Sequence, residues 1–164
     1  MEEKKNLLTL EEQVVSLLQN KNFHISFAES CTGGLCSARL VSVASASAVF
    51  DAGMVTYANE AKIKYLGVKP ETIESYGVVS EPVAGQMAEG VAKAQNAEVG
   101  VGVSGIAGPS GGTATKPVGM VCFGFYVDGA VTTVTKQFGD LGRNVVRETA
   151  TEFVFETLVE LLHE

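Results

Sequence analysis

A serine and a cysteine, Ser30 and Cys31, stand side by side just after a predicted strand. Thr32, Gly33 and Gly34 follow them and lead into a predicted helix. Backbone N–H groups converge where a strand meets a helix start, and they can stabilise an oxyanion or hold a phosphate. Either Ser30 or Cys31 could be the nucleophile, although the thiol is the more reactive at neutral pH. A plain N-cap with a glycine turn is the alternative, and spacing alone favours it.

Histidine, the usual partner of such a nucleophile, is scarce in this chain. The only candidates are His24 and His163, and His163 is the penultimate residue. His24 lies near the start of the strand that precedes Ser30, so we expect it at the opposite edge of the sheet. A Cys–His pair and a Ser–His–Asp triad are therefore weakly supported. The pattern favours a lysine or a tyrosine as the base.

Tyr57 and Lys62 are the candidates for that role. Tyr57 ends a predicted strand at the same sheet edge as Ser30, and Lys62 lies about one helical turn into the next element. A lysine acts as a base only if burial or a nearby cation lowers its pKa from about 10.4. A surface lysine and a core tyrosine are the alternative. Lys64 and Lys69 differ from Lys62 only in their distance from Tyr57.

A second glycine-rich loop, residues 105–113, follows another predicted strand. Its candidate ligand-binding residues are Gly105, Gly108, Gly111, Gly112 and Thr113. The loop matches neither a P-loop nor a dinucleotide-binding fingerprint. Its N–H groups could form an anion-binding nest, to which Lys116 would add a charge. An irregular connection without a ligand is an equally good interpretation.

Strand and helix patterns alternate along the chain. The apolar spacing predicts helices at 10–20, 35–43, 59–66, 80–94 and 143–162, with a helical turn at 70–76. It predicts strands at 23–28, 50–57, 99–104, 118–127 and 131–138. Thr9 and Glu12 form a possible capping box, and Asp128-Gly129 indicates a hairpin. We expect one α/β domain over 1–164, a three-layer α/β/α sandwich. Its mixed, mostly parallel sheet of about five strands would have the hairpin as its one antiparallel element.

Composition narrows the possible partners. The 164 residues carry a formal net charge of −7 and no cluster of Lys or Arg, so direct nucleic-acid binding is not expected. Cys31, Cys36 and Cys122 form neither a disulfide framework nor, with the two histidines, a metal site. We expect no metal. The chain shows neither a signal peptide nor a run of about twenty apolar residues, which indicates a cytoplasmic protein without membrane contact.

Five blocks give the chain a specific resemblance. They are AESCTGG at 28–34, VTYANEAK at 55–62, GVVS at 77–80, SGIAGPSGG at 104–112 and KPVG at 116–119. In this order the chain resembles the CinA C-terminal domain family, the nicotinamide-nucleotide amidohydrolases, from about residue 10 to residue 162. The resemblance implies hydrolysis of the carboxamide of nicotinamide mononucleotide to nicotinic acid mononucleotide and ammonia.

The same resemblance assigns roles to residues. Ser30 is implied as the nucleophile, with Tyr57 and Lys62 as its activating partners, which raises Lys62 above Lys64. N–H groups near Thr32 and Gly33 would hold the oxyanion, and the 105–113 loop would contact ribose or phosphate. No cofactor is implied, the ligand is a small nucleotide, and a homo-oligomer is expected.

Two alternatives and two departures stay open. A non-catalytic nucleotide-binding module, or an interaction protein linked to competence or DNA damage, would fit the same family. Many relatives carry this domain behind a larger N-terminal domain. Two residues separate Asp140 from Arg143, where the family often has Gly-Asp-Arg. Arg143 and Arg147 are therefore interpreted either as substrate ligands or as capping and ion-pairing residues.

Overall fold

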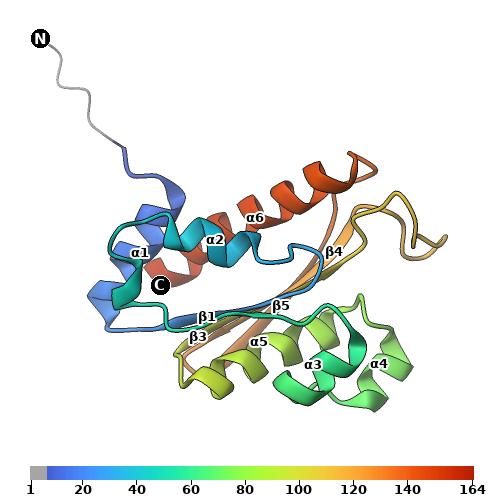
Figure 1. The fold of residues 1–164 in the computed structure, drawn as a ribbon, viewed down its shortest axis with the longest axis horizontal. Coiled ribbons are helices and arrows are strands. Elements are labelled where there is room, and N and C mark those ends of the chain that lie inside the picture. Colours follow the sequence, from blue (N-terminus) through green and yellow to red (C-terminus); the bar gives the residue numbers. More distant parts are fainter. Residues whose placement is uncertain (1–6) are drawn as a thin grey trace, which may run out of the picture.

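The computed structural model describes residues 7–164, whose helices cover both faces of a central sheet (Figure 1). The helices are α1 (Leu10–Lys21), α2 (Leu35–Val41), α3 (Asn59–Leu66), α4 (Pro70–Tyr76), α5 (Glu81–Gln95) and α6 (Arg143–His163), with a 3-10 helix at Ala46–Ala48. The strands are β1 (Ile25–Glu29), β2 (Met54–Val55), β3 (Val99–Gly105), β4 (Met120–Val127) and β5 (Ala130–Gln137). Helices α1, α2 and α6 cover one face and α3, α4 and α5 the other, which confirms the three-layer sandwich.

The sheet has five strands in the order β2-β1-β3-β4-β5. β1 is parallel to β2 and β3, and β4 is antiparallel to both β3 and β5. Four of the strands therefore share one direction, and the prediction of a mixed, mostly parallel sheet is confirmed. The hairpin is not its only antiparallel element, because β4 also pairs antiparallel with β3. The 106–119 connection contains no crossover helix, which a parallel return would require.

The predicted strand at 50–57 is mostly wrong. Only β2, two residues long, pairs with β1, and one isolated parallel bridge joins Phe50 to Ile25. Between them, the hydroxyl of Ser26 donates to the carbonyl of Ala52 over 2.7 Å, where a ladder bond would otherwise form. The edge of the sheet is therefore held by side chains as well as by backbone pairing.

Local signals at the ends of elements are confirmed. Thr9 and Glu12 form the predicted capping box at the start of α1. Asp128 and Gly129 both have positive φ, 45° and 96°, as a type I′ hairpin turn requires. The hydroxyl of Ser80 accepts from the N–H of Val83 and caps α5. These local rules place the ends of α1, β4, β5 and α5.

Helix α5 lies unusually close to the sheet. A Cβ atom added at Gly102 would lie 2.3 Å from the carbonyl oxygen of Ala84, and one added at Gly124 would lie 2.2 Å from the same atom. Glycine in both strands therefore lets the helix backbone approach. This contact fixes the start of α5, and with it the preceding residues Val78 and Val79.

None of the helices in residues 7–164 combines the length and the apolar character of a membrane-spanning segment.

Candidate active site

Three strand ends meet at one edge of the sheet. β1, β2 and β3 are parallel, so their carboxyl ends lie together. Ser30 follows β1, Tyr57 follows β2, and Gly105 ends β3. His24 lies at the other end of β1, where its ring Nδ1 is 2.8 Å from a carboxylate oxygen of Asp51. The expectation that His24 is remote from Ser30 is confirmed.

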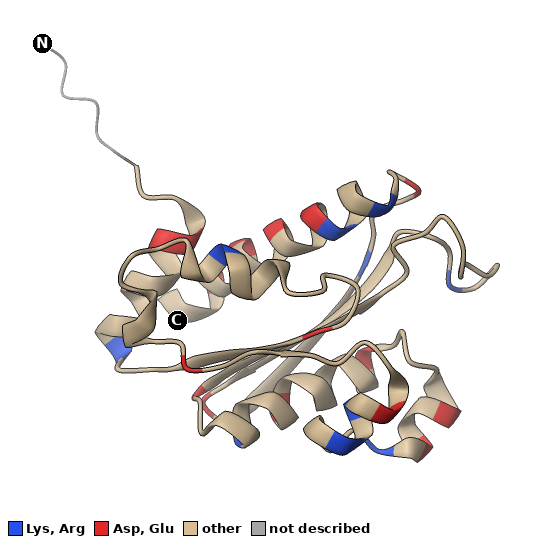
Figure 2. Ribbon diagram, in the orientation of Figure 1, with Lys and Arg blue, Asp and Glu red and all other residues tan. Residues whose placement is uncertain are grey.

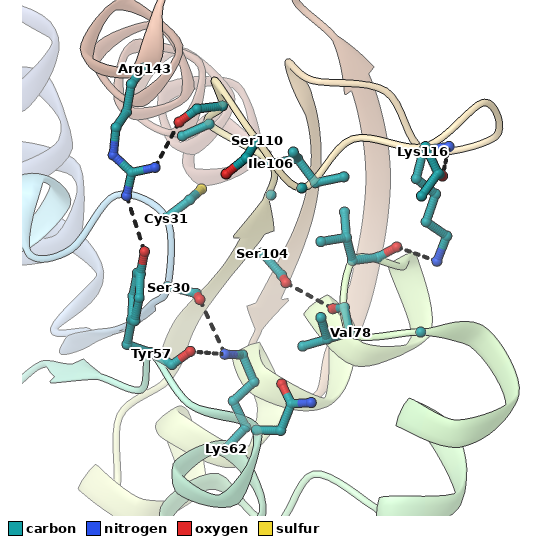
Figure 3. A pocket seen from close by; sticks show the side chains of 18 residues that line it. Ser30, Cys31, Tyr57, Lys62, Val78, Ser104, Ile106, Ser110, Lys116 and Arg143 are labelled. Atoms are coloured by element: carbon teal, nitrogen blue, oxygen red, sulfur yellow. Dashed lines mark hydrogen bonds between the residues drawn. The ribbon is translucent and has the colours of Figure 1, made fainter.

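A pocket of about 460 Å³ opens at this edge (Figure 3). Its walls come from the ends of β1 and β3, the start of α3, the α4–α5 connection, the 105–119 loop and the start of α6. The lining residues are Ser30, Cys31, Tyr57, Asn59, Lys62, Gly77, Val78, Val79, Ser104, Gly105, Ile106, Ala107, Gly108, Ser110, Gly111, Thr113, Lys116 and Arg143. Segments far apart in sequence therefore share one cavity.

Ser30 and Lys62 are in direct contact in this pocket. The Nζ of Lys62 lies 3.1 Å from the Oγ of Ser30, and the lysine is 1% exposed. The carbonyl oxygens of Thr56 and Tyr57 lie 2.7 Å and 3.2 Å from the same nitrogen. Burial lowers the pKa of Lys62, because a charged ammonium loses its hydration there. The structure therefore brings together the serine and the lysine that the sequence singled out without showing whether they meet.

The three contacts of Lys62 suit both of its protonation states. The ammonium would donate one N–H to each of the three oxygens. In the neutral amine, which burial favours, the carbonyls of Thr56 and Tyr57 accept the two N–H groups and the lone pair faces the hydroxyl of Ser30. The arrangement can accept a proton from Ser30, which is what a general base for a serine nucleophile must do.

Cys31 is placed and buried differently from Ser30. It lines the pocket but is 7% exposed, and burial raises the pKa of its thiol to about 11. The thiol therefore stays protonated near neutral pH, and a protonated thiol is a poor nucleophile. Between the two neighbours, the geometry favours Ser30.

Tyr57 reaches the pocket in two ways. Its carbonyl holds Lys62, while its phenol is directed toward α6 and accepts a hydrogen bond from Arg143 over 3.1 Å (Figure 3). The residue is 63% exposed, and its hydroxyl bonds neither Ser30 nor Lys62. The structure therefore brings the backbone of Tyr57, and not its phenol, to the serine–lysine pair.

Two arginines of α6 hold the loops around the pocket. Arg143 donates to the carbonyl of Gly108 over 2.8 Å, as well as to Tyr57. Arg147 donates to the carbonyls of Cys31 and Thr32 over 2.8 Å and 3.1 Å. Neither arginine pairs with a carboxylate among residues 7–164. Three of their partners, Gly108, Cys31 and Thr32, accept through backbone carbonyls, which carry no signal in a sequence.

The pocket is cationic within an acidic chain. Lys62, Lys116 and Arg143 line it, and no Asp or Glu is among the described lining residues. The Asp and Glu residues lie mainly along the helices (Figure 2). Lys116 donates to the carbonyls of Tyr76 and Val79 and so joins its loop to the start of α5. Such a pocket suits an anionic ligand, for which Lys116 and Arg143 are the available partners.

The other residues predicted to bind ligand divide into two groups. The first group, Gly105, Gly108, Gly111 and Thr113, lines the pocket, whereas the second, Thr32, Gly33, Gly34 and Gly112, does not. The N–H of Gly33 donates to the carbonyl of Ser30 over 3.0 Å, so it is already occupied. Any oxyanion donor in the first loop must therefore be another N–H group.

Glu29 is a functional residue that the motif analysis left without a role. Its side chain is fully buried. Its carboxylate accepts from the N–H groups of Cys36 and Ser37, over 2.8 Å and 3.1 Å, and from the hydroxyl of Ser37 over 2.8 Å. It thereby caps the start of α2 and fixes the far end of the loop that begins at Ser30. A lone acid directly before the serine, at the end of a predicted strand, was the available signal.

The fold and the pocket define an α/β domain with a serine–lysine pair at the carboxyl edge of its sheet. Comparison with known proteins gives the family: residues 7–162 match the CinA C-terminal domain, and the chain belongs to that family.

The relatives agree with this assignment. The chain is 48% identical to a CinA-like protein of Kosmotoga olearia over 90% of its own length, and 49% identical to one of Chlorobaculum tepidum over 85%. It spans about a third of the length of these curated relatives, 36% and 34%. A solved structure, the competence/damage inducible protein CihA of Agrobacterium tumefaciens, superposes with a TM-score of 0.89. That structure is 39% identical, and the match covers 97% of this chain and 99% of the other.

Proposed function

We propose that this protein hydrolyses the carboxamide of nicotinamide mononucleotide, giving nicotinic acid mononucleotide and ammonia. The observation that carries the proposal is the contact between Ser30 and Lys62, with the lysine held by two carbonyls and its pKa lowered by burial. A buried lysine beside a serine, without any histidine, is an arrangement for covalent acyl chemistry.

The first half of the reaction forms an acyl-enzyme. The Oγ of Ser30 attacks the carboxamide carbon while Lys62 takes the hydroxyl proton. The tetrahedral intermediate then collapses, the C–N bond breaks, and the ammonium of Lys62 returns the proton to the departing nitrogen, which leaves as ammonia. In the second half, a water attacks the ester, Lys62 takes a proton from the water, and Ser30 leaves with that proton.

The remaining walls of the pocket fit the rest of this substrate. Val78, Val79 and Ile106 offer apolar surface for the faces of the pyridinium ring. Lys116 and Arg143 supply positive charge for the phosphate, and none of the lining residues in the described part of the chain is a carboxylate that would oppose it. Because the ligand is a small anion, the proposal is compatible with a net charge of −7, which disfavours nucleic acid.

The test is ammonia release from nicotinamide mononucleotide by the parent, Ser30→Ala, Lys62→Ala and Lys64→Ala. Lys64 lies on the same helix but outside the pocket, so it is the matched control. We expect the Ser30 and Lys62 variants to lose activity by about a thousandfold or more while staying folded, and Lys64→Ala to match the parent.

Free nicotinamide is the second substrate in this test. Because it lacks the phosphate, we expect it to be hydrolysed much more slowly than the mononucleotide. A parent that binds the nucleotide and releases no ammonia would overturn the proposal and leave a nucleotide-binding module. Equal turnover of the two amides would overturn the assignment of the cationic residues.

A further inference from the structure

The loop that follows Ser30 is a tight turn closed by its own backbone. The N–H of Gly33 donates to the carbonyl of Ser30 over 3.0 Å, and Gly33 has a φ of 58°. A peptide group is planar and trans, so its carbonyl and its N–H point in opposite directions. Fixing a carbonyl in this turn therefore also fixes the direction of the N–H that follows it.

Arg147 fixes two consecutive carbonyls of the turn from α6. Its Nε donates to the carbonyl of Cys31, and its Nη2 donates to the carbonyl of Thr32. Its remaining nitrogen donates to the side chain of Asn144 over 3.0 Å, which orients the guanidinium. Arg147 does not line the pocket, so it acts on the turn from outside.

The direction of two N–H groups follows from these contacts. Because Arg147 of α6 holds the carbonyl of Cys31, the N–H of Thr32 on the same peptide points away from α6. Because Arg147 holds the carbonyl of Thr32, the N–H of Gly33 on the same peptide points toward the carbonyl of Ser30 and bonds it. This bond fixes the orientation of the Ser30–Cys31 peptide, and therefore the direction of the N–H of Cys31.

The N–H groups of Cys31 and Thr32 are not used by the fold. Neither the N–H of Cys31 nor that of Thr32 has an acceptor within residues 7–164, although Cys31 and Thr32 are both buried. Buried N–H groups are rarely left without a partner. The N–H of Cys31 lies on the peptide directly after the serine and belongs to a residue that lines the pocket, which is where an oxyanion donor for attack by Ser30 would be, whereas Thr32 does not line the pocket.

We propose that Arg147 is a positioning residue, which holds the turn after Ser30 so that the N–H of Cys31, a residue of the pocket wall, is an oxyanion donor for attack by Ser30. The inference rests on the proposed function, because it assigns Arg147 a part in the same acyl transfer. Arg147 touches neither substrate nor reacting atoms, so its loss affects the transition state and leaves substrate binding intact.

The test compares the parent, Arg147→Met and Arg39→Met in two assays. The first is the steady-state kinetics of ammonia release from nicotinamide mononucleotide. The second is the rate at which a fluorophosphonate labels Ser30, a reaction in which the Oγ–P bond forms, fluoride leaves and Lys62 takes the serine proton. Arg39 is the control because it joins α1 and α6 through Glu11 and Glu152, away from the pocket.

For Arg147→Met we expect kcat and the labelling rate to fall by about ten- to a hundredfold. KM should not change. The pH dependence of kcat/KM should not change either, because the protonation of Lys62 determines it. Arg39→Met should lower Tm without changing the labelling rate of the folded protein. A parent labelling rate in Arg147→Met, or a loss confined to KM, would overturn the inference. If the parent is labelled at Ser30 in an Arg147-dependent way but releases no ammonia, only the proposed substrate is wrong.

Discussion

The Nζ of Lys62 lies 3.1 Å from the Oγ of Ser30, inside a pocket that contains no carboxylate among its described lining residues. In an ion pair, the ammonium form of a lysine is stabilised by the neighbouring anion. Here the nearest acceptors are a hydroxyl and two backbone carbonyls, which are neutral. Desolvation therefore decides the protonation of Lys62 and makes the neutral, basic form accessible.

The pH dependence of activity should follow this amine. Because only neutral Lys62 accepts the serine proton, we expect kcat/KM for ammonia release to rise with pH through an apparent pKa below about 10.4, the ordinary lysine value. Initial rates from about pH 6 to about pH 10 measure this pKa. Lys62→Arg, which stays charged, should be inactive throughout. A profile independent of pH over this range would contradict Lys62 as the base.

Stability should depend on pH for the same reason. The pKa of Lys62 is lower in the folded than in the unfolded chain, so the unfolded chain binds more protons between the two values. In that window stability rises with pH. We expect the free energy of unfolding of the parent, relative to Lys62→Met, to increase from pH 7 toward about pH 10. Urea titrations measure it, and the exposed Lys64→Met should show no such trend; a falling difference would contradict the shift.

Cys31 should be dispensable for catalysis and slow to react. Its pKa of about 11 leaves little thiolate near neutral pH, so iodoacetamide should modify the folded protein slowly and the urea-unfolded protein quickly. Cys31→Ala should retain activity within a few-fold of the parent. Loss of activity in a folded Cys31→Ala, together with activity in Ser30→Ala, would make the thiol the nucleophile.

Removing the phenol of Tyr57 should weaken binding more than chemistry. The hydroxyl contacts Arg143, whereas Lys62 is held by the Tyr57 carbonyl, which every substitution keeps. For Tyr57→Phe we therefore expect kcat within a few-fold of the parent and a higher KM, because Arg143 loses one of its two anchors. Steady-state kinetics separate the two constants. A large loss in kcat with unchanged KM would make the phenol a proton relay.

Glu29→Gln should destabilise the protein. An amide NH₂ would replace one of the oxygens that accept from Cys36 and Ser37, leaving buried N–H groups unsatisfied. We expect a loss of about 1–3 kcal/mol in the free energy of unfolding. The matched control is Glu89→Gln, whose exposed pair with Lys93 should contribute no more than about 0.5 kcal/mol. Equal losses in the two variants would mean that Glu29 is not a cap.

The sequence predicts the elements and most of the pocket because those signals are local. Ser30 and Tyr57 follow strands that alternate with helices, so parallel pairing brings them to one edge. The position of Lys62 near the same edge can also be predicted, because Lys62 lies within two helical turns of Tyr57 in the sequence. The hairpin at Asp128-Gly129 was readable from two residues alone, since its turn needs positive φ at both.

The missed features depend on distant partners. Nothing near Arg147 indicates that it would meet carbonyls of Cys31 and Thr32, more than a hundred positions away. The same holds for Glu29, whose role depends on where α2 begins. The antiparallel pairing of β3 with β4 depends on the 106–119 connection, which contains no helix that could return the chain for a parallel pairing.

The close contact of α5 with the sheet limits how this domain can diversify. At Gly102 and Gly124 even a methyl group would collide with the helix backbone, so the layer beneath the pocket is closed to substitution. Altered specificity must therefore come from the rim, where Ser110, Gly111 and Thr113 lie on an exposed connection. Directed evolution toward larger or differently charged amides should accumulate its changes in that connection and spare the strands.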